Sequence, residues 1–541
     1  MAEAAIIIGI FSYIVFALGL ALPQFMFKPS GINGLKILGV LFVLSFFILA
    51  FRKRIWISIK EFFLDISRDR LSFFIFFLIF FHALINLIGA LGPELGFDAL
   101  WYHLTIPKIY LQNLQISFLP GGLFYYSAMP KLTEMLYLLS LPFSPNGILA
   151  KLINFFFGIF SAAALYNLSK KYLNKRWSLM TTLVFYSTLI VGWESITANV
   201  DLSRVFFEIM ALTFFLKWWN KEDNQNKIIL VELGVMIGLA ISTKLTALTT
   251  LPVFLVLIYL KSRSLKNSLF VFLPSLFILL PWLIFSLTNT GNPIFPIFGG
   301  ILDKSHNLVL NPLIMMKNLW ILFYYPRDPI SPIFLIFLPL IGVRFLKANV
   351  REKIFRRVGG LKGYLILSLI FWCLISKVDG ARYFLPYLPA LSLFLTIFLQ
   401  QENKFYKKVF VPLLAFVSLI NIFYRSMANK KFIPVVFGKE KAENFLTKNL
   451  NFNFGDFYDV DGELKKIIKS DDLVLVYGGH NLFYLNFPFM HSSYAKPGTS
   501  FSYILTIKES LPARLRPLKL IYSNKITGVN LYLFGKRWQP I

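Results

Sequence analysis

Long apolar runs recur along most of the chain, from Ala4 almost to Tyr424. A helix needs about 20 mostly apolar residues to cross the ~30 Å hydrocarbon core of a bilayer, and many of these runs approach that length. Of the 541 residues, 57% are hydrophobic and 15% are charged, whereas soluble domains are roughly 45–50% apolar and about 25% charged. The pattern predicts a polytopic α-helical membrane protein and excludes a soluble globular one.

We predict about 13 transmembrane helices within a domain that covers residues 1–428. The first run lacks the basic region and cleavage site of a signal peptide, so we expect it to be a retained span. The fourth combines one span with a preceding partial helix. The predicted spans are Ala4–Leu22, Leu35–Phe51, Leu71–Leu91, Lys131–Leu168, Ser178–Gly192, Leu202–Trp218, Ile228–Thr243, Leu245–Leu260, Ser268–Thr288, Ser331–Leu346, Leu361–Ser376, Tyr383–Leu399 and Val409–Tyr424.

Basic residues predict the orientation of these spans. Lysine and arginine gather in alternate loops, and cytoplasmic loops carry such an excess. The net charge of +28 is therefore attributed to loops beside anionic lipid and not to nucleic-acid binding. The N-terminus is predicted inside. The basic residues of the cytoplasmic loops are Arg52, Lys53, Arg54, Lys60, Arg68, Arg70, Lys170, Lys171, Lys175, Arg176, Lys261, Arg263, Lys266, Arg344, Lys347, Arg351, Lys353, Arg356, Arg357 and Lys362.

Four segments then lie on the outer side, together with the C-terminal part of the chain. The segments are Gly92–Pro130, Trp193–Asp201, Asn289–Ile330 and Lys377–Arg382. Residues 429–541 are more polar and contain a helix-like stretch and four short β-like runs, which predicts a small extracytoplasmic α/β domain. The stretch and the runs are Gly462–Lys469, Leu473–Tyr477, Tyr503–Ile507, Leu518–Tyr522 and Val529–Phe534.

The first outer segment contains GFDALWYHLTIPKIYL, Gly96 to Leu111. On a helix, Asp98, Thr105 and Gln112 share one stripe, which predicts a helix in the membrane interface with its polar side toward a cavity. Pro107 interrupts such a helix unless a new one starts there. The alternative is a solvated interfacial loop. The residues predicted to face lipid are Leu100, Leu104, Ile106 and Leu111.

Acidic residues mark the outer ends of two spans. Asp98 and Asp201 lie there, with Glu94 and Glu194 nearby, and ionisable groups at a span edge are candidates for function. An aspartate in this position can act as a general base on an incoming hydroxyl. The alternative is that each aspartate caps the helix it precedes. For Asp98 the residues behind it favour a functional site: Trp101, Tyr102 and His103.

Three cations lie on the same predicted side. Arg382 and Lys377 bracket the fourth outer segment, and Lys244 lies in an outer hairpin. Arginine binds phosphate through two parallel hydrogen bonds, so Arg382 can hold the phosphate of a lipid-linked substrate. The alternative is a basic residue that reaches from a span end toward the headgroups, which is common.

Several patterns are absent from the sequence. There is no GxxxxGK[ST], so we expect no phosphate-binding loop for a nucleotide. There is no HExxH, one cysteine and five scattered histidines, which argues against a zinc site and a disulfide framework. The pair Gly234 and Gly238 is predicted to form a small-residue packing face between helices.

The order and sidedness of these features resemble the GT-C glycosyltransferases, which include protein O-mannosyltransferases and lipid A aminoarabinose transferases. The family pattern is a span, an outer loop with an essential acid and interfacial helices, and a second acid at the next outer loop. Asp98 in GFDALWYH and Asp201 in NVDLS stand at those places. The segments Gly238–Leu248 and Ala381–Leu391 are also similar to recurrent family segments. The resemblance covers roughly Leu71 to Tyr424.

The resemblance implies an inverting transferase in the cytoplasmic (plasma) membrane that moves a sugar from a polyprenyl-phosphate donor to a glycan, lipid or protein acceptor outside. It implies Asp98 and Asp201 as catalytic residues. As substrate-binding residues we predict, from their chemistry and position, Arg382, Lys244, Lys377, Trp101, Tyr102, His103 and Glu94. Many members have Asp-Glu in the first loop, whereas Ala99 follows Asp98 here, so no metal cofactor is expected. The WWD-type motif of oligosaccharyltransferases is missing from the outer domain.

Two other classes remain as alternatives. A transporter or flippase for lipid-linked glycans would often show internal repeats and broken helices near the membrane midplane, and the sequence shows neither. A glycan ligase or polymerase is also polytopic, but it would not require the outer C-terminal domain.

Overall fold

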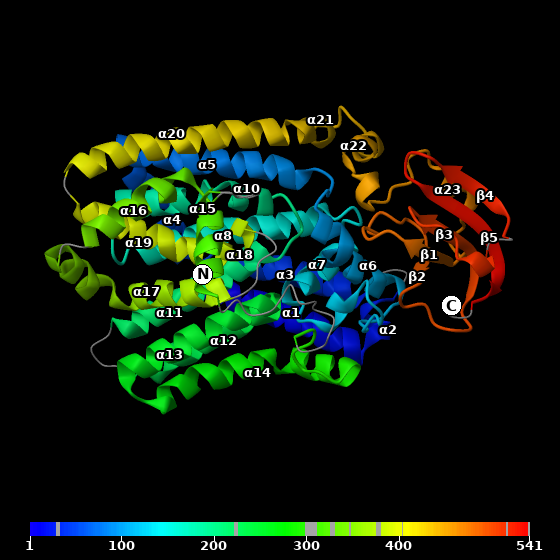
Figure 1. Cartoon of the computed structure of the whole chain (residues 1–541), viewed down its shortest axis with the longest axis horizontal. Coiled ribbons are helices and arrows are strands. Elements are labelled where there is room, and N and C mark those ends of the chain that lie inside the picture. Colours follow the sequence, from blue (N-terminus) through cyan, green and yellow to red (C-terminus); the bar gives the residue numbers. More distant parts are fainter. Residues whose placement is uncertain are drawn as a thin grey trace.

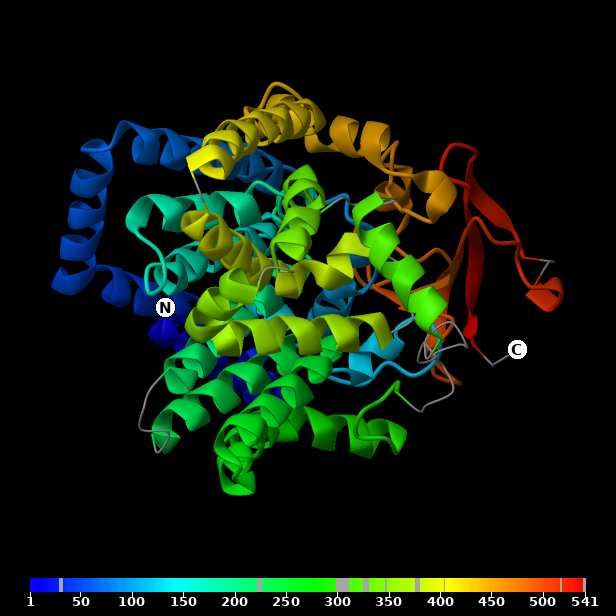
Figure 2. The ribbon, with the colours of Figure 1, turned by 60° about the vertical axis from the view of Figure 1, so that its left-hand side comes forward.

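The computed structural model describes residues 1–28, 33–220, 226–297, 311–324, 330–345, 348–374, 380–402, 404–515 and 518–538. Figure 1 shows a helical body, in which long helices run roughly along one direction, and a small sheet at one end. Figure 2 shows the same division from a second direction, with the C-terminal strands standing away from the N-terminal helices. The predicted class, a helical membrane protein with a small C-terminal α/β part, agrees with this arrangement.

Apolar sequence accounts for most helices of the body, and the boundaries follow the predicted spans closely. The fifth predicted span is divided, because a turn separates α9 from α10. The helices are α1 Ala2–Ala21, α2 Pro23–Met26, α3 Gly34–Ala50, α4 Lys53–Ser67, α5 Arg70–Leu91, α6 Thr105–Gln112, α7 Leu132–Ser140, α8 Ile148–Ser169, α9 Lys175–Tyr186, α10 Leu189–Glu194, α11 Asp201–Trp219, α12 Lys227–Thr243, α13 Thr250–Ser262, α14 Leu265–Thr290, α15 Pro312–Tyr324, α16 Pro332–Phe345, α17 Ala348–Leu374, α18 Gly380–Phe384, α19 Leu388–Gln401 and α20 Lys404–Asn429.

Seven helical stretches in the described part of the chain are long and apolar enough to cross a membrane. Three shorter apolar helices, Gly34–Ala50, Pro332–Arg344 and Val358–Leu374, add to them. The chain is thus a multi-span membrane protein, while the number 13 stays a prediction. The seven stretches are Ala2–Ala21, Arg70–Leu91, Ile148–Ser169, Leu245–Ser262, Leu265–Thr290, Ala381–Gln401 and Lys404–Val436.

Helix α11 is central in the body and carries charges that lower its hydropathy. It packs against α8 and α12, and most of its side chains are buried. Arg204 donates to Glu208 one turn later at 2.7 Å and to the Thr246 hydroxyl at 2.8 Å. Because each buried charge is paired and hydrogen-bonded, α11 holds them without an unpaired ion in the core.

The predicted glycine packing face is confirmed between α12 and α14. A Cβ at Gly234 would lie 2.4 Å from the Val271 carbonyl oxygen, and one at Gly238 would lie 2.7 Å from Cβ of Ile278. Any side chain there would push the helices apart. Small residues therefore allow the close backbone approach that packs membrane helices without a hydrophobic driving force.

The C-terminal part begins after α20 with short helices α21 Ile433–Val436, α22 Ala442–Asn449 and α23 Glu463–Ile467. Five strands follow in the order β2-β1-β3-β5-β4. The pairs β1–β2 and β1–β3 are parallel, whereas β3–β5 and β4–β5 are antiparallel. The four predicted strands are present, and a fifth, β2, was missed. The strands are β1 Val474–Gly478, β2 Phe489–His491, β3 Ser500–Ile507, β4 Leu520–Asn524 and β5 Val529–Arg537.

Alternation along β1 sends side chains to both faces of this sheet. Val474 and Val476 join the main core of the helical body. Leu475 and Tyr477 point the other way and pack with Trp538 in a second, smaller core. The sheet is therefore fixed to the body through one face and has a hydrophobic core of its own on the other.

Candidate functional site

Arg382 lies at the centre of a cluster of three carboxylates, one from the segment Gly92–Pro130 and two from the segment Trp193–Asp201. Its Nη1 is 2.5 Å from Asp98 Oδ2, its Nη2 is 2.9 Å from Asp201 Oδ2, and its Nε is 3.0 Å from Glu194 Oε1. The guanidinium also lies over the Trp193 ring, with Cζ 5.6 Å from the ring centroid. Two acids and one arginine that the sequence had placed on the same side of the membrane thus meet at one point.

Lys244, at the end of α12, completes the cluster. Its Nζ donates to Asp201 Oδ1 at 2.7 Å and lies 5.9 Å from the centroid of the Tyr383 ring. Asp201 therefore has one cation on each carboxylate oxygen. Lys377, the third predicted cation, lies outside the described residues.

The capping alternative is wrong for both aspartates. Helix α11 begins at Asp201 itself, and neither the α11 N-terminus nor the turn after Asp98 has a side-chain cap bond among the described residues. The carboxylates are instead directed at Arg382. Asp201 still gains from the positive end of the helix dipole at the first turn of α11.

Asp98 precedes one turn of π-helix, Ala99–His103, in which the Leu104 N–H donates to the Ala99 carbonyl at 2.9 Å. Such turns are rare and frequent at functional sites. Burial disfavours the charged carboxylate, but the guanidinium of Arg382 outweighs it and holds the pKa of Asp98 below its ordinary value. Asp98 is therefore ionised at neutral pH, the state that a proton acceptor needs.

The predicted continuous interfacial helix is wrong. The π-helical turn ends at His103, and α6 starts afresh at Thr105, so that Pro107 occupies its third position, where proline is tolerated. The apolar side does not face lipid, because Leu100, Leu104 and Ile106 are fully buried in the protein core.

The polar side of α6 is covered by the C-terminal part instead of facing a cavity. Lys108 Nζ donates to the carbonyls of Phe483, at 2.6 Å, and of Leu485, and Gln112 donates to Phe487 O at 3.4 Å. Burial lowers the pKa of Lys108 to about 7. The α6 segment is thus a structural link between the helical body and the C-terminal sheet.

Glu94, a predicted binding residue, is completely buried and already bonded. Its Oε1 accepts from the backbone N–H groups of Leu95 and Gly96 at 2.8 and 2.7 Å, and its Oε2 accepts from Ala198 N at 2.6 Å. The carboxylate ties the first outer segment to the turn before Asp201. This geometry suits a residue that positions the two aspartates.

The aromatic residues behind Asp98 differ in what they contact. Tyr102 stacks on Tyr126 at 3.8 Å between ring centroids, and Trp101 Nε1 donates to Leu123 O at 3.1 Å. His103 is buried, with its Nδ1 2.8 Å from Glu134 Oε1. Of the three, Trp101 keeps a partly exposed ring beside the cluster.

Sequence reasoning missed the buried pair of Glu134 and Lys131. Both are buried at the start of α7, three residues apart, and Glu134 bonds His103. They fall inside the predicted span Lys131–Leu168, where two opposite charges in an apolar run are themselves a signal of function. Glu194 was noticed only as a neighbour of Asp201, although it bonds Arg382 directly.

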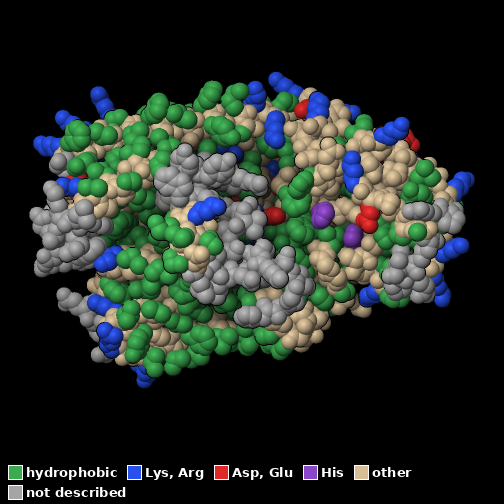
Figure 3. Space-filling model, in the orientation of Figure 1, with side chains coloured by type: hydrophobic (Ala, Val, Ile, Leu, Met, Phe, Trp, Pro, Cys, Tyr) green, Lys and Arg blue, Asp and Glu red, His purple; other side chains and the backbone are tan. Residues whose placement is uncertain are grey.

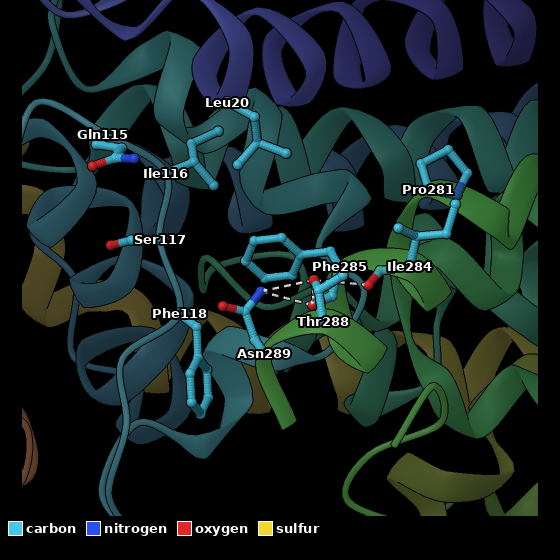
Figure 4. A pocket seen from close by; sticks show the side chains of 10 residues that line it. All are labelled: Leu20, Gln115, Ile116, Ser117, Phe118, Pro281, Ile284, Phe285, Thr288 and Asn289. Atoms are coloured by element: carbon cyan, nitrogen blue, oxygen red, sulfur yellow. Dashed lines mark hydrogen bonds between the residues drawn. The ribbon is translucent and has the colours of Figure 1, made fainter. Parts of the chain in front are cut away.

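Figure 3 shows acidic and histidine side chains at the surface between the hydrophobic helical body and the C-terminal part. A different hollow, a cavity of about 430 Å³, lies between the C-terminal ends of α1 and α14 and residues 115–118. Figure 4 shows its lining, to which Leu20, Phe118 and Asn289 contribute and to which no predicted site residue belongs. Among the described residues, no three His, Cys, Asp or Glu side chains converge to hold a metal ion.

Part of the chain is similar to a known protein family. The family model of dolichyl-phosphate-mannose-protein mannosyltransferases matches residues 137–285, from α7 into α14. No curated protein matches the sequence. The matched region contains Glu194, Asp201 and Lys244, three members of the cluster on Arg382.

Solved structures extend the likeness to most of the chain. The crystal structure of ArnT from Cupriavidus metallidurans bound to undecaprenyl phosphate is 15% identical, with a TM-score of 0.54 over 85% of this chain and 98% of ArnT. Its apo form is 14% identical, with a TM-score of 0.55 over 83% of this chain and 96% of that one. At this identity the likeness shows the fold. The chain is thus similar to dolichyl-phosphate-mannose-protein mannosyltransferases over residues 137–285, and it shares the fold of ArnT over most of its length.

Proposed function

We propose that the protein transfers a sugar, with inversion, from a polyprenyl-phosphate donor to an acceptor hydroxyl on the extracytoplasmic face of the plasma membrane. The observation that carries the proposal is Arg382, a single guanidinium shared by Asp98, Asp201 and Glu194. The structure of ArnT bound to undecaprenyl phosphate supports the donor class, because that protein has the same fold.

The donor phosphate is assigned to Arg382 and Lys244. Both ammonium and guanidinium groups are partly exposed, at 18% and 11% of the side chain, whereas the Asp201 carboxylate they share is 3% exposed. Asp201 accepts from both cations and holds them in place, and their partial exposure leaves them accessible to a phosphate. Preorganised cations of this kind stabilise the charge that develops on the departing phosphate.

Asp98 is assigned as the general base. The acceptor oxygen attacks the anomeric carbon, the bond between that carbon and the phosphate oxygen breaks, and its electron pair leaves with the polyprenyl phosphate. Asp98 takes the hydroxyl proton. When the phosphate occupies Arg382, it competes with Asp98 for the guanidinium, and a carboxylate released from its ion pair is a stronger base.

A neutral Glu194 does not repel the negatively charged donor phosphate. Burial raises the pKa of Glu194 to about 8, with the charge of Asp201 adding to the effect. With Glu194 protonated, the charges of Asp98 and Asp201 balance those of Arg382 and Lys244. An anionic donor then meets a cluster without net negative charge.

The proposed orientation places the N-terminus inside and residues 429–541 outside, as the basic loops predict. Single cysteines introduced at Lys60 and Lys266 should be protected from an impermeant thiol reagent, whereas one at Lys448 should be labelled from outside. These probes belong in a background in which the natural Cys373, which is buried, is replaced by serine. Labelling of Lys448→Cys only after permeabilisation would contradict the proposed site, since Asp98 would then face the cytoplasm.

The direct test is transfer by the purified protein in lipid nanodiscs. Polyprenyl-phosphate-linked hexoses and aminopentoses are supplied with candidate acceptors, and the release of polyprenyl phosphate and the acceptor mass are measured. Binding of undecaprenyl phosphate alone is measured in parallel. A protein that moves labelled donor across liposomes without cleaving it would be a flippase, the main alternative, and the proposed transfer would be wrong.

A further inference from the structure

A second cluster, made of aromatic rings, includes Phe97 and Trp101, which flank Asp98 in the sequence. It comprises Phe97 and Trp101 from the first outer segment and Phe454 and His480 from the C-terminal part, and we call it the aromatic wall. The Phe97 ring centroid lies 5.6 Å from Trp101, 5.4 Å from Phe454 and 6.3 Å from His480. Trp101 and His480 are 5.8 Å apart and nearly perpendicular.

The rings of the wall are exposed or partly exposed, although Trp101 also packs against the main core. Phe454 is 65% exposed, His480 is exposed, and Phe97 and Trp101 are partly exposed. Exposed aromatic groups gathered in one place on a protein mark a binding surface more often than scattered ones do. Here the helical body and the C-terminal part each contribute two rings, so the wall exists only when both are in place.

Backbone contacts hold the wall rigid. Phe454 ends a 3₁₀ turn, Phe452–Phe454, and Gly455 follows in the left-handed region at φ +96°. The Gly455 carbonyl accepts from the N–H groups of His480 and Asn481, both at 3.4 Å. On the body side, the Trp101 indole is fixed by its bond to Leu123 O. Rings held in this way bind a ligand with little further loss of entropy.

The chemistry of the wall fits a sugar ring. A pyranose presents C–H groups on one face and hydroxyls around its edge. The C–H groups pack on the electron-rich faces of aromatic rings, while hydroxyls reach water or polar neighbours. Two rings of the wall, Phe97 and Trp101, stand one residue before and three residues after Asp98 in the sequence, so a sugar packed there would lie near Asp98.

The position also separates acceptor from donor. The phosphate cations Arg382 and Lys244 are on the body side of the cluster and come from α18 and the end of α12. Phe454 and His480 belong to the C-terminal part, whereas Asp201 and Glu194 belong to the helical body. Because both rings are exposed, an acceptor that arrives from outside can reach them.

We infer that the aromatic wall binds a pyranose ring of the acceptor, so that the acceptor is a glycan or a glycolipid headgroup. The acceptor role of this sugar rests on the proposed transfer. Binding of a sugar at the aromatic wall does not depend on it and is tested separately. Specificity for the acceptor then depends on the C-terminal part, which supplies Phe454 and His480.

The test measures sugar binding without requiring transfer. Full-length protein in nanodiscs is mixed with methyl glycosides of glucose, mannose, galactose and N-acetylglucosamine and with short oligosaccharides, and saturation-transfer NMR reports which protons contact the protein. We expect contact through ring C–H protons of at least one sugar. Phe454→Ala and His480→Ala should each weaken that binding about tenfold, and Phe454→Trp should retain it.

The matched control is Phe437→Ala, because Phe437 is 67% exposed, lies in the same outer region and is not part of the wall. It should leave sugar binding unchanged. The inference is overturned if the wild type binds none of the sugars, or if Phe454→Ala and Phe437→Ala bind them equally. Undecaprenyl phosphate binding, measured in the same samples, tests the proposed function separately. If the protein binds sugar but does not bind undecaprenyl phosphate, the inference about the aromatic wall is supported and the proposed donor is wrong.

Discussion

The two aspartates bonded to Arg382 have opposite surroundings. Asp98 lies between α5 and the π-helical turn Ala99–His103, is 23% exposed and has Arg382 as its charged partner. Asp201 begins the buried helix α11, is 3% exposed and has two cations, Arg382 and Lys244. The same residue type thus occurs once at the opening of the site and once behind it.

This difference teaches which aspartate can do chemistry. A base must be reached by the acceptor and must exchange a proton, and a partly exposed carboxylate with one partner can do both. A carboxylate held between two cations in a buried site is costly to protonate and instead fixes those cations. We therefore propose a catalytic role for Asp98 and a positioning role for Asp201.

The largest expected effect is that of Asp98→Asn on turnover. Asparagine keeps the size and the hydrogen-bonding oxygen but cannot take a proton, so kcat should fall by about 10²–10⁴. Binding of undecaprenyl phosphate should survive, because the phosphate is held by Arg382 and Lys244. Full transfer activity in Asp98→Asn would show that Asp98 is not the general base, and the proposed difference in role between Asp98 and Asp201 would be wrong.

Asp201→Ala should act on stability first. It leaves Lys244 without its carboxylate and Arg382 with fewer partners in a buried site, which costs about 3–5 kcal/mol when one member of a buried pair is removed. Asp98→Ala, with a more exposed carboxylate, should cost clearly less. Thermal unfolding of the two variants in the same detergent provides the comparison. Equal losses would show that both aspartates have the same structural role.

Arg382→Lys is expected to weaken donor binding by about 10–100-fold, since hydrogen bonds to charged groups contribute about 1.5–3 kcal/mol. Lysine keeps the charge but cannot reach three carboxylates and a phosphate with one compact ammonium. The affinity for undecaprenyl phosphate is measured together with expression and membrane insertion, which should stay normal. Unchanged affinity would mean that Arg382 serves the carboxylates alone.

Much of this site could be predicted from the sequence because charges are rare in an apolar chain. Asp98, Asp201, Arg382 and Lys244 stand out at span ends, and the basic loops place them on one side. Their mutual contact could not be predicted, since Asp98 and Arg382 are 284 residues apart. Local rules left helix capping as an alternative for both aspartates, whereas in the folded chain both carboxylates form ion pairs with Arg382.

The fold shows the same limit. Apolar run lengths predicted the helices well, and alternation predicted four of the five strands. The three-residue strand Phe489–His491 is too short to show a period of two. The stretch from Gly96 to Leu111 was assigned a lipid-facing side because its sequence is amphipathic. The structure shows instead that the C-terminal part covers α6 and that Leu100 and Leu104 are buried in the protein core.

The smallest expected effect concerns pH and the third carboxylate on Arg382. Because the pKa of Glu194 is raised to about 8, raising the pH through that value should ionise it and add one negative charge to the cluster. A phosphate would then bind more weakly. A coupling of one pKa unit corresponds to about tenfold in affinity.

The measurement is the affinity for undecaprenyl phosphate between about pH 7 and about pH 9, where the phosphate, with a second pKa near ~6, has already lost its proton. Wild type should lose affinity as the pH rises, whereas Glu194→Gln should bind with nearly constant affinity at the level of the wild type near pH 7. Glutamine keeps the size and the hydrogen bonds of a protonated glutamate, so the variant isolates the charge. The same decline in Glu194→Gln would assign the pH dependence to another group, and the neutral role of Glu194 between the two aspartates would be wrong.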